Sequence, residues 1–284
     1  MPHPRYTTSV RKHTFGAAIL VAAAAAVPIL AQRVQVDLLS EEEIQARLES
    51  GRVGQSKRPG VLRELFVKSG CAPAEQRVDR NRGNVICTLP GETPSTIVVG
   101  GHTDFVTRGE GIVDDWSGSS LLPSLYFALK SRPRRHTFVF VGFTAEEEGL
   151  AGSREYVWRL KKDQWSSIRA FVNLECLGLT TVKVWVRRSA PELVTRLREI
   201  AQSIGIIVDG VNIDRVGDDD THSFLDASIP VISIHSITEE TLPILHTPRD
   251  RIDAIHPAEY YKTYRLLACY LAYLDSKIPD GGHR

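Results

Sequence analysis

The chain alternates short runs rich in valine and isoleucine with segments of helical spacing, and this alternation most constrains its fold. The runs are apolar on both faces, and we expect strands over residues 97–99, 137–143, 170–174 and 230–234. Strands of this kind are covered by helices on both sides of a sheet. Helical spacing follows each strand, over residues 117–131, 153–161, 191–204 and 257–276. The pattern predicts an α/β fold, a three-layer α/β/α sandwich with a central, largely parallel mixed sheet.

The first 31 residues differ from the rest of the chain and are expected to be a signal peptide. Three basic residues, Arg5, Arg11 and Lys12, precede an uncharged run over residues 14–31. This order is typical of a secretory signal. An uncleaved membrane anchor is the alternative, because the run approaches the roughly 20 residues that span a bilayer. Either interpretation places the remaining chain outside the cytoplasm, in the periplasm or secreted.

No linker, repeat or low-complexity stretch divides the chain after the expected signal. We therefore assign residues 1–31 to the signal peptide and residues 32–284 to a single domain. The formal net charge is +1, and affinity for phosphate groups needs a surplus of lysine and arginine. Nucleic acid is thus not expected as a partner, and neither is a membrane beyond the signal segment.

The cysteines give information about the compartment rather than about the chemistry. The four cysteines of the chain include no Cys-x-x-Cys spacing, so neither a thiolate zinc site nor a redox dithiol is expected. Export makes disulfides possible, and Cys71 and Cys87 are the pair expected to form one. Cys176 and Cys269 lie in apolar surroundings and are expected to be buried free thiols.

Side chains that bind metals occur where the expected strands end, with one carboxylate pair just before a helix. In chain order they are His102, Asp104, Asp114, Asp115, Glu146, Glu147, Glu148, Glu175 and His246. In open α/β sheets, ligands bind beyond the carboxyl ends of the strands. We therefore expect these imidazoles and carboxylates to meet at one edge of the sheet.

This inventory suits zinc chemistry. Zinc accepts imidazole nitrogen and carboxylate oxygen as ligands, and a catalytic zinc keeps one position open for water. Two histidines and three carboxylates can hold two ions if one carboxylate bridges them, and a further carboxylate can serve as general base. Taken singly, each group has a structural explanation, such as a surface histidine or an aspartate pair that caps a helix. Their coincidence at successive strand ends favours the zinc site.

The motifs occur in the order of a known family. They are His102-Thr-Asp104, Asp114-Asp-Trp-Ser-Gly118, Ala145-Glu-Glu-Glu-Gly-Leu-Ala-Gly-Ser153, Asn173-Leu-Glu175 and Leu245-His-Thr247. Together they resemble the co-catalytic zinc aminopeptidases related to bacterial leucyl aminopeptidase, a family with glutamate carboxypeptidases as members and glutaminyl cyclases as a close branch. The resemblance extends from about Asn84 to the C-terminus, and the Glu-Glu-x-Gly-Leu-x-Gly-Ser block is its most specific part.

The resemblance implies a role for each motif residue. One zinc ion would be held by His102 and Glu175, the other by Glu147 and His246, and Asp114 would bridge the two. Glu146 would be the general base, and Asp104 would orient the His102 ring by accepting its other N–H. The implied activity is that of a zinc metallopeptidase, an aminopeptidase that hydrolyses N-terminal residues from peptides with a free N-terminus through a metal-bridged water.

The chain departs from the family pattern at two places. The family usually has aspartate where this chain has Glu175, so the metal distances on that side are expected to differ. The family also often has an Asp-His pair before its last core strand, and here His222 is displaced by one position. We consider two roles for His222: stabilising the oxyanion of the transition state, or an ordinary solvated loop residue.

Two other functions remain open on this scaffold. A glutaminyl cyclase would use a single zinc ion on Asp114, Glu147 and His246, all of which are present. A binding domain without catalytic activity would need no metal. Retention of His102 with Glu175, and of the Gly-Leu-x-Gly-Ser sequence, favours the peptidase over the cyclase. The complete ligand set together with Glu146 argues against the binding domain.

Overall fold

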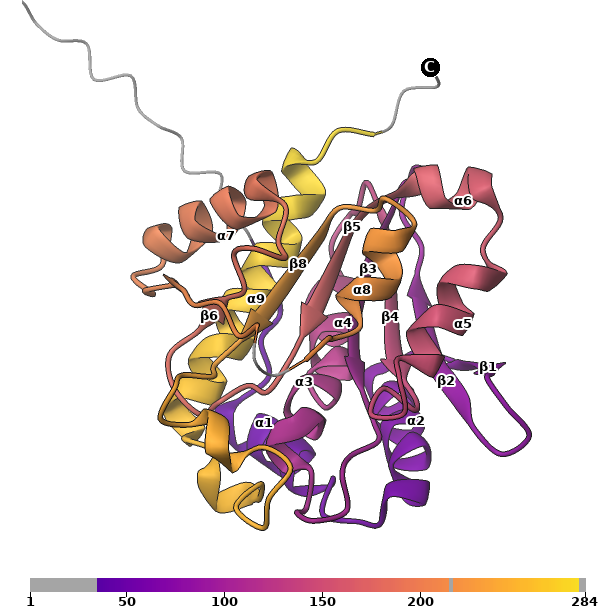
Figure 1. The fold of residues 1–284 in the computed structure, drawn as a ribbon. Coiled ribbons are helices and arrows are strands. Elements are labelled where there is room, and N and C mark those ends of the chain that lie inside the picture. The colour runs from indigo at the N-terminus through magenta and orange to yellow at the C-terminus, as the bar shows by residue number, and fades with distance from the viewer. Residues whose placement is uncertain (1–34, 215–216, 281–284) are drawn as a thin grey trace, which may run out of the picture. The chain divides into compact units, whose positions relative to one another are not determined.

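Eight strands form one mixed sheet in a computed structural model that describes residues 35–214 and 217–280 (Figure 1). The strands are β1 (Ala74–Arg77), β2 (Gly83–Leu89), β3 (Thr96–His102), β4 (Thr137–Phe143), β5 (Ile168–Leu174), β6 (Lys183–Val184), β7 (Asp209–Gly210) and β8 (Val231–His235). They lie in the order β1-β2-β4-β3-β5-β8-β6-β7. The expected signal peptide over residues 1–31 lies outside the described residues.

The centre of the sheet is parallel and antiparallel pairs flank it on both sides, while the edge strand β7 pairs with β6 in parallel. Strands β4, β3, β5 and β8 pair in parallel, whereas β1 with β2, β2 with β4, and β6 with β8 pair antiparallel. The four strands expected from the valine- and isoleucine-rich runs are these four parallel ones. The prediction of a largely parallel mixed sheet is confirmed.

Helices cover both faces of the sheet (Figure 1). They are α1 (Glu41–Glu49), α2 (Arg58–Ser69), α3 (Ser117–Ser119), α4 (Leu122–Lys130), α5 (Ala151–Arg159), α6 (Lys162–Ser167), α7 (Pro191–Ser203), α8 (Thr221–Asp226) and α9 (Pro257–Lys277). Shorter turns of helix occur at η1 (Gln55–Lys57), η2 (Ile112–Trp116), η3 (Leu242–Ile244) and η4 (Ile252–Ala254). Among the described helices, none is long and apolar enough to cross a membrane.

Alternation along strand β3 produces the three layers. Ile97 and Val99 are fully buried in a core that includes apolar residues of α2, α4, α7 and α9. Val98, between them in sequence, is buried in a second core with residues of α5 and α8. Successive side chains of a strand point to opposite faces, so each face of the sheet has its own core. The expected three-layer sandwich in a single domain is confirmed.

The expected disulfide joins the end of the α2 segment to the sheet. Cys71 and Cys87 are bonded, with their Cα atoms 6.4 Å apart. Cys176 is buried as expected, whereas Cys269 is only partly buried. The bond closes a short loop that contains β1 and the turn into β2, so it ties an antiparallel edge of the sheet to the helix layer.

Removing this disulfide should destabilise the fold. We expect the Cys71→Ala, Cys87→Ala double variant to lose about 3 kcal/mol of unfolding free energy, because the bond restricts a loop of 16 residues in the unfolded chain. Urea denaturation of the oxidised proteins measures the difference. Cys269→Ala is the matched control, since it removes a thiol outside the bridge. A loss in the double variant no larger than that of the control would contradict the prediction.

Candidate metal centre

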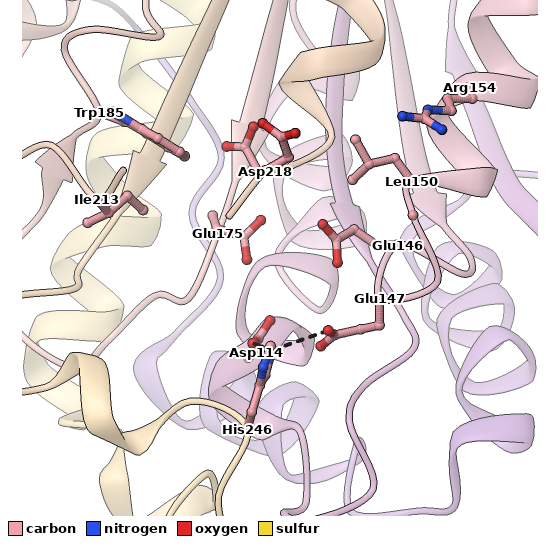
Figure 2. Close-up of a pocket in the computed structure, with 12 residues that line it drawn as sticks. Asp114, Glu146, Glu147, Leu150, Arg154, Glu175, Trp185, Ile213, Asp218 and His246 are labelled. Carbon is pink, nitrogen blue, oxygen red and sulfur yellow. Dashed lines mark ion pairs between the residues drawn. The ribbon is translucent and has the colours of Figure 1, made fainter. Parts of the chain in front are cut away.

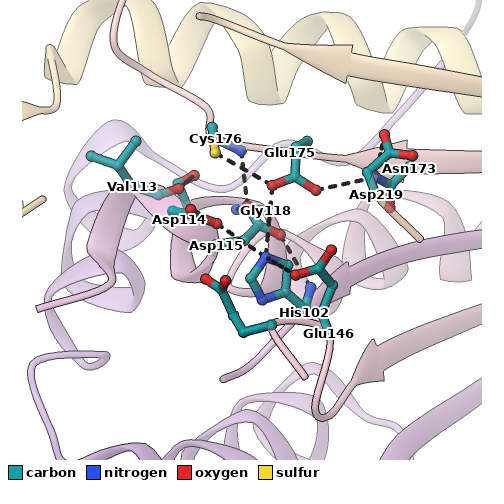
Figure 3. Close-up of polar contacts among 12 residues, drawn as sticks. His102, Val113, Asp114, Asp115, Gly118, Glu146, Asn173, Glu175, Cys176 and Asp219 are labelled. Carbon is teal, nitrogen blue, oxygen red and sulfur yellow. Dashed lines mark hydrogen bonds and ion pairs between the residues drawn. The ribbon is translucent and has the colours of Figure 1, made fainter. Parts of the chain in front are cut away.

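The candidate ligands lie together at the carboxyl ends of the parallel strands, as the motifs predicted. His102 is the last residue of β3, and Glu175 directly follows β5. Glu146 and Glu147 lie in the loop between β4 and α5, and Asp114 lies in η2. His246 comes from the loop after β8, which also contains η3. Figures 2 and 3 show these side chains pointing toward one another from separate elements.

Asp114 faces a different histidine with each of its carboxylate oxygens. Its Oδ1 lies 3.1 Å from Nε2 of His102, and its Oδ2 lies 3.1 Å from Nε2 of His246. On the first side, Oε1 of Glu175 lies 3.6 Å from the same His102 nitrogen. On the second side, Oε2 of Glu147 lies 3.2 Å from the His246 nitrogen. Two groups of ligand atoms therefore share one carboxylate.

These separations fit zinc. Bonds of 2.0–2.2 Å in a tetrahedral arrangement place neighbouring ligand atoms about 3.3–3.6 Å apart, close to the spacings around Asp114. The other oxygen of Glu147, Oε1, is buried without a hydrogen-bond partner in the described part of the chain. A buried carboxylate oxygen of this kind calls for a cation or a donor. The nitrogen and oxygen donor set is one that zinc accepts.

The cluster of candidate ligands is buried and has more carboxylates than histidines, so its negative charge is not balanced. Burial raises the pKa of Glu146 to about 10, and the carboxylates of Asp220 and Glu175 add to the effect. Burial and the charge of Asp114 raise the pKa of Glu147 to about 7. The hydrogen bond to Asp114 raises the pKa of His246 to about 9. A bound divalent ion would offset this excess and reverse the direction of these shifts for the carboxylates.

Asp115 has a structural role that differs from the role of Asp114. Its buried carboxylate accepts backbone N–H groups from His102 at 3.1 Å, from Gly118 at 3.0 Å and from Cys176 at 3.0 Å. Asp115 thus ties the ends of β3 and β5 to the start of α3. The peptide bond between the two aspartates is cis. These contacts agree with the choice of Asp114 as the bridging residue.

The structure corrects the expected contact of Asp104. The Nδ1 atom of His102 lies 3.0 Å from the backbone carbonyl oxygen of Asp104, whereas the Asp104 carboxylate is 3.7 Å away. That carboxylate instead accepts the backbone N–H groups of Glu146 at 3.1 Å and Glu147 at 3.2 Å. Asp104 therefore orients the His102 ring through its main chain and fixes the two glutamates through its side chain.

Further residues that the motifs did not assign hold the ligands in place. Asn173 donates to Oε2 of Glu175 at 3.2 Å and to Asp219 at 3.3 Å. Asp219 in turn accepts a hydrogen bond from the hydroxyl of Ser233 at 2.6 Å. Asp250 accepts the backbone N–H of Val113 at 2.7 Å, next to Asp114. The run of aspartates over residues 218–220 gave a signal for Asp219, but no local pattern pointed to Asp250.

Three non-glycine residues beside or within the ligand set have left-handed backbone conformations. Ala145 has φ of 55°, Cys176 of 48° and His246 of 56°. Such angles are uncommon for residues with a Cβ and are concentrated at functional sites. Each one turns the chain at the point where a ligand leaves its strand or loop.

The candidate residues line one cavity of about 260 Å³ (Figure 2). Five of them do so: Asp114, Glu146, Glu147, Glu175 and His246. One wall carries Trp185 and Ile213, and the wall across the cavity carries Leu150 and Arg154. The base candidate Glu146 lies between these walls, with its Oε2 3.8 Å from Nε2 of His102.

His222 is not brought to this cavity. Its Nδ1 lies 3.3 Å from Asp218, and its Nε2 lies 3.6 Å from Asp226. The helix α8 carries both His222 and Asp226, and the ring lies along that helix rather than over the ligands. Of the two roles considered for His222, stabilising an oxyanion is not supported by this position, and His222 has no part in the mechanism proposed below.

Residues 84–271 match the family model of peptidase family M28. The chain belongs to this family. The match confirms the resemblance drawn from the motifs, and it supports the expectation of a metallopeptidase. Aminopeptidase YwaD of Bacillus subtilis (strain 168) is 30% identical to this chain over 175 residues, covering 57% of this chain and 37% of its own length. The chain spans well under half the length of the curated relatives it matches.

Solved structures show the same fold. The zinc aminopeptidase BSAP of Bacillus subtilis has a TM-score of 0.61 and 25% identity, covering 68% of this chain and 50% of that one. A glutaminyl cyclase from an Acidobacteriales bacterium has a TM-score of 0.69 and 17% identity, covering 85% of this chain and 96% of that one. The cyclase similarity concerns the fold alone.

Proposed function

We propose that this M28 family chain is an exported zinc aminopeptidase that removes N-terminal residues from peptides. The observation that carries the proposal is the position of Asp114, whose two oxygens each face a separate histidine at 3.1 Å. A carboxylate placed in this way suits a bridge between two ions. Family membership and the aminopeptidase relatives support peptide hydrolysis as the reaction.

In this proposal, the two groups of ligand atoms would each hold one zinc ion. His102 and Glu175 would hold the first, Glu147 and His246 would hold the second, and Asp114 would contribute an oxygen to each. Zinc bound there would polarise the scissile carbonyl and make water a better nucleophile at neutral pH.

Glu146 acts as the general base through its carboxylate. It accepts a proton from the attacking water and passes it to the nitrogen of the leaving amine. Its backbone N–H is held by the Asp104 carboxylate at 3.1 Å, and its side chain lines the cavity. Asp104 therefore fixes the position of the base relative to the neighbouring candidate ligand Glu147, and such fixed geometry favours proton transfer.

Export is supported by two independent features. The residues expected to form a signal peptide, 1–31, carry a basic flank followed by an apolar run. The disulfide between Cys71 and Cys87 is a bond that persists in oxidising compartments and is rare in the cytosol. A secreted or periplasmic location accounts for both.

The amino group of the substrate should decide whether a peptide is cleaved. The cavity lining has six acidic residues, Asp114, Glu146, Glu147, Glu175, Asp218 and Asp219, and such a lining favours a free ammonium group. We expect N-acetylation of a leucyl reporter amide to lower kcat/KM by roughly 10- to 100-fold or more, because a charge-assisted contact is lost. Chelation with 1,10-phenanthroline should abolish turnover of both reporter amides.

Rates on the free and acetylated reporters, with and without added zinc after chelation, give the measurement. Equal cleavage of both reporters would contradict an aminopeptidase and indicate an endopeptidase or a general amidase. Ring closure of an N-terminal glutamine without peptide cleavage would instead assign the chain to the cyclase branch. The first ligand group, His102 with Glu175, supports the peptidase over a cyclase with one zinc ion.

A further inference from the structure

Arg154 brings a cation into a cavity that is otherwise acidic. It lies in the first turn of α5, directly after the Gly-Leu-x-Gly-Ser block, and its side chain lines the cavity beside Leu150 (Figure 2). Trp185 and Ile213 form the opposite wall, with the candidate ligands between the two. Arg154 is therefore placed to touch a substrate, at a point separate from the ligand atoms.

Helix stability does not explain an arginine at this position. The N-terminal end of a helix carries a partial positive charge, so a cation in the first turn is unfavourable. Helix α5 follows the usual preference at its other end, where Arg159 lies in the last turn. A residue that breaks a local preference without local compensation is a candidate for function.

Pairing within the protein does not explain it either. Two acidic residues close to Arg154 in the sequence pair with other arginines, Glu148 with Arg82 at 2.7 Å and Glu155 with Arg159 at 2.5 Å. Asp218, in the lining of the same cavity, pairs with Arg188 at 2.5 Å. Across residues 35–214 and 217–280, the Arg154 side chain has no ion pair and no hydrogen bond. Its guanidinium therefore presents its donors to the cavity or to solvent.

We propose, on the basis of the aminopeptidase function above, that Arg154 binds a carboxylate of the peptide substrate and makes the enzyme selective for peptides that carry one. A guanidinium matches a carboxylate with two parallel hydrogen bonds. The apolar wall formed by Trp185 and Ile213 contacts an uncharged side chain of the same peptide.

Two sources of the carboxylate fit this chemistry, the free C-terminus of a short peptide and an acidic side chain. The cavity of about 260 Å³ is small beside the roughly 300–1,000 Å³ of typical ligand sites. The carboxylate therefore lies within one or two residues of the scissile bond. Matched peptide pairs separate the sources.

The experiment compares kcat/KM within three pairs that differ only in one carboxylate. Leu-Gly against Leu-Gly-amide tests the C-terminus, Leu-Glu-amide against Leu-Gln-amide tests a side chain after the scissile bond, and the p-nitroanilides of Glu and Gln test one before it. We expect the unaltered protein to prefer the carboxylate in one pair by about 10- to 100-fold, as for a hydrogen-bonded charged group. In Arg154→Gln, the ratio of kcat/KM between the two members of that pair should fall to near one. The change should come from a higher KM for the peptide with the carboxylate, with kcat little altered.

Two variants make the result specific. Arg154→Lys keeps the charge but loses the two-pronged geometry, so its ratio should be intermediate. Arg159→Gln removes the same charge from the same helix outside the cavity and should keep the full ratio. A ratio in Arg154→Gln that matches the unaltered protein, or an equal fall in Arg159→Gln, would overturn the assignment of Arg154. Cleavage of neither member of any pair would overturn the aminopeptidase function itself, and Arg154 with it.

Discussion

Replacing Glu146 with glutamine should lower kcat by about 10²- to 10⁴-fold while zinc stays bound. The side chain lies beside the ligands, with its Oε2 3.8 Å from Nε2 of His102, and the proposal assigns it to neither group of ligands. Glutamine preserves the volume, and the backbone contact of residue 146 with Asp104 does not depend on the side chain. The loss should therefore come from the missing proton acceptor alone, and KM should change little.

The adjacent Glu147→Gln is the matched control, because it makes the same chemical change one residue away. Oε2 of Glu147 lies 3.2 Å from Nε2 of His246, so this variant should release zinc as well as lose activity. Metal content by inductively coupled plasma mass spectrometry, measured beside kcat, distinguishes the two. Loss of zinc from Glu146→Gln, with activity retained by Glu147→Gln, would show that the two roles are exchanged.

The strands that could be predicted from sequence are the ones buried on both faces. β3 and β4 have runs of valine, isoleucine and phenylalanine, because helices cover both sides of the central sheet. The edge strands lack that pattern. β1 reads Ala-Glu-Gln-Arg and is largely exposed, and β6 and β7 are each two residues long. Their pairing depends on neighbours distant in the sequence, which no local pattern records.

The candidate ligands could be predicted because strand ends fix where a side chain emerges, whereas their supporting contacts could not. The contact of Asp250 with the segment beside Asp114 spans 137 positions, and it forms only once the loop after β8 packs against η2. The orientation of helix α8 about its own axis determines the direction of the His222 side chain. The spacing of residues in the sequence does not reveal that orientation. Asp218, one of the acidic residues that line the cavity, is paired with Arg188, a contact that no local pattern in the sequence indicated.

The largest change in metal content should follow Asp114→Asn. Each oxygen of Asp114 faces one histidine at 3.1 Å, so losing its charge weakens both groups of ligand atoms at once. We expect the variant to lose both zinc ions and all measurable peptidase activity. The effect should exceed the roughly 10- to 100-fold loss of metal affinity that follows removal of an outer partner of a ligand.

Glu175→Gln is the comparison that tests the bridge, because Glu175 contacts only the His102 side, at 3.6 Å. It should lose one ion and keep the ion held by Glu147 and His246. Native mass spectrometry at limiting zinc counts the ions per chain, and circular dichroism checks that each variant remains folded. If Asp114→Asn loses no more zinc than Glu175→Gln, Asp114 does not bridge two ions. A single ion in the unaltered protein, unaffected by Glu175→Gln, would instead fit the one-zinc site of a cyclase, since a peptidase of the kind proposed needs both groups filled.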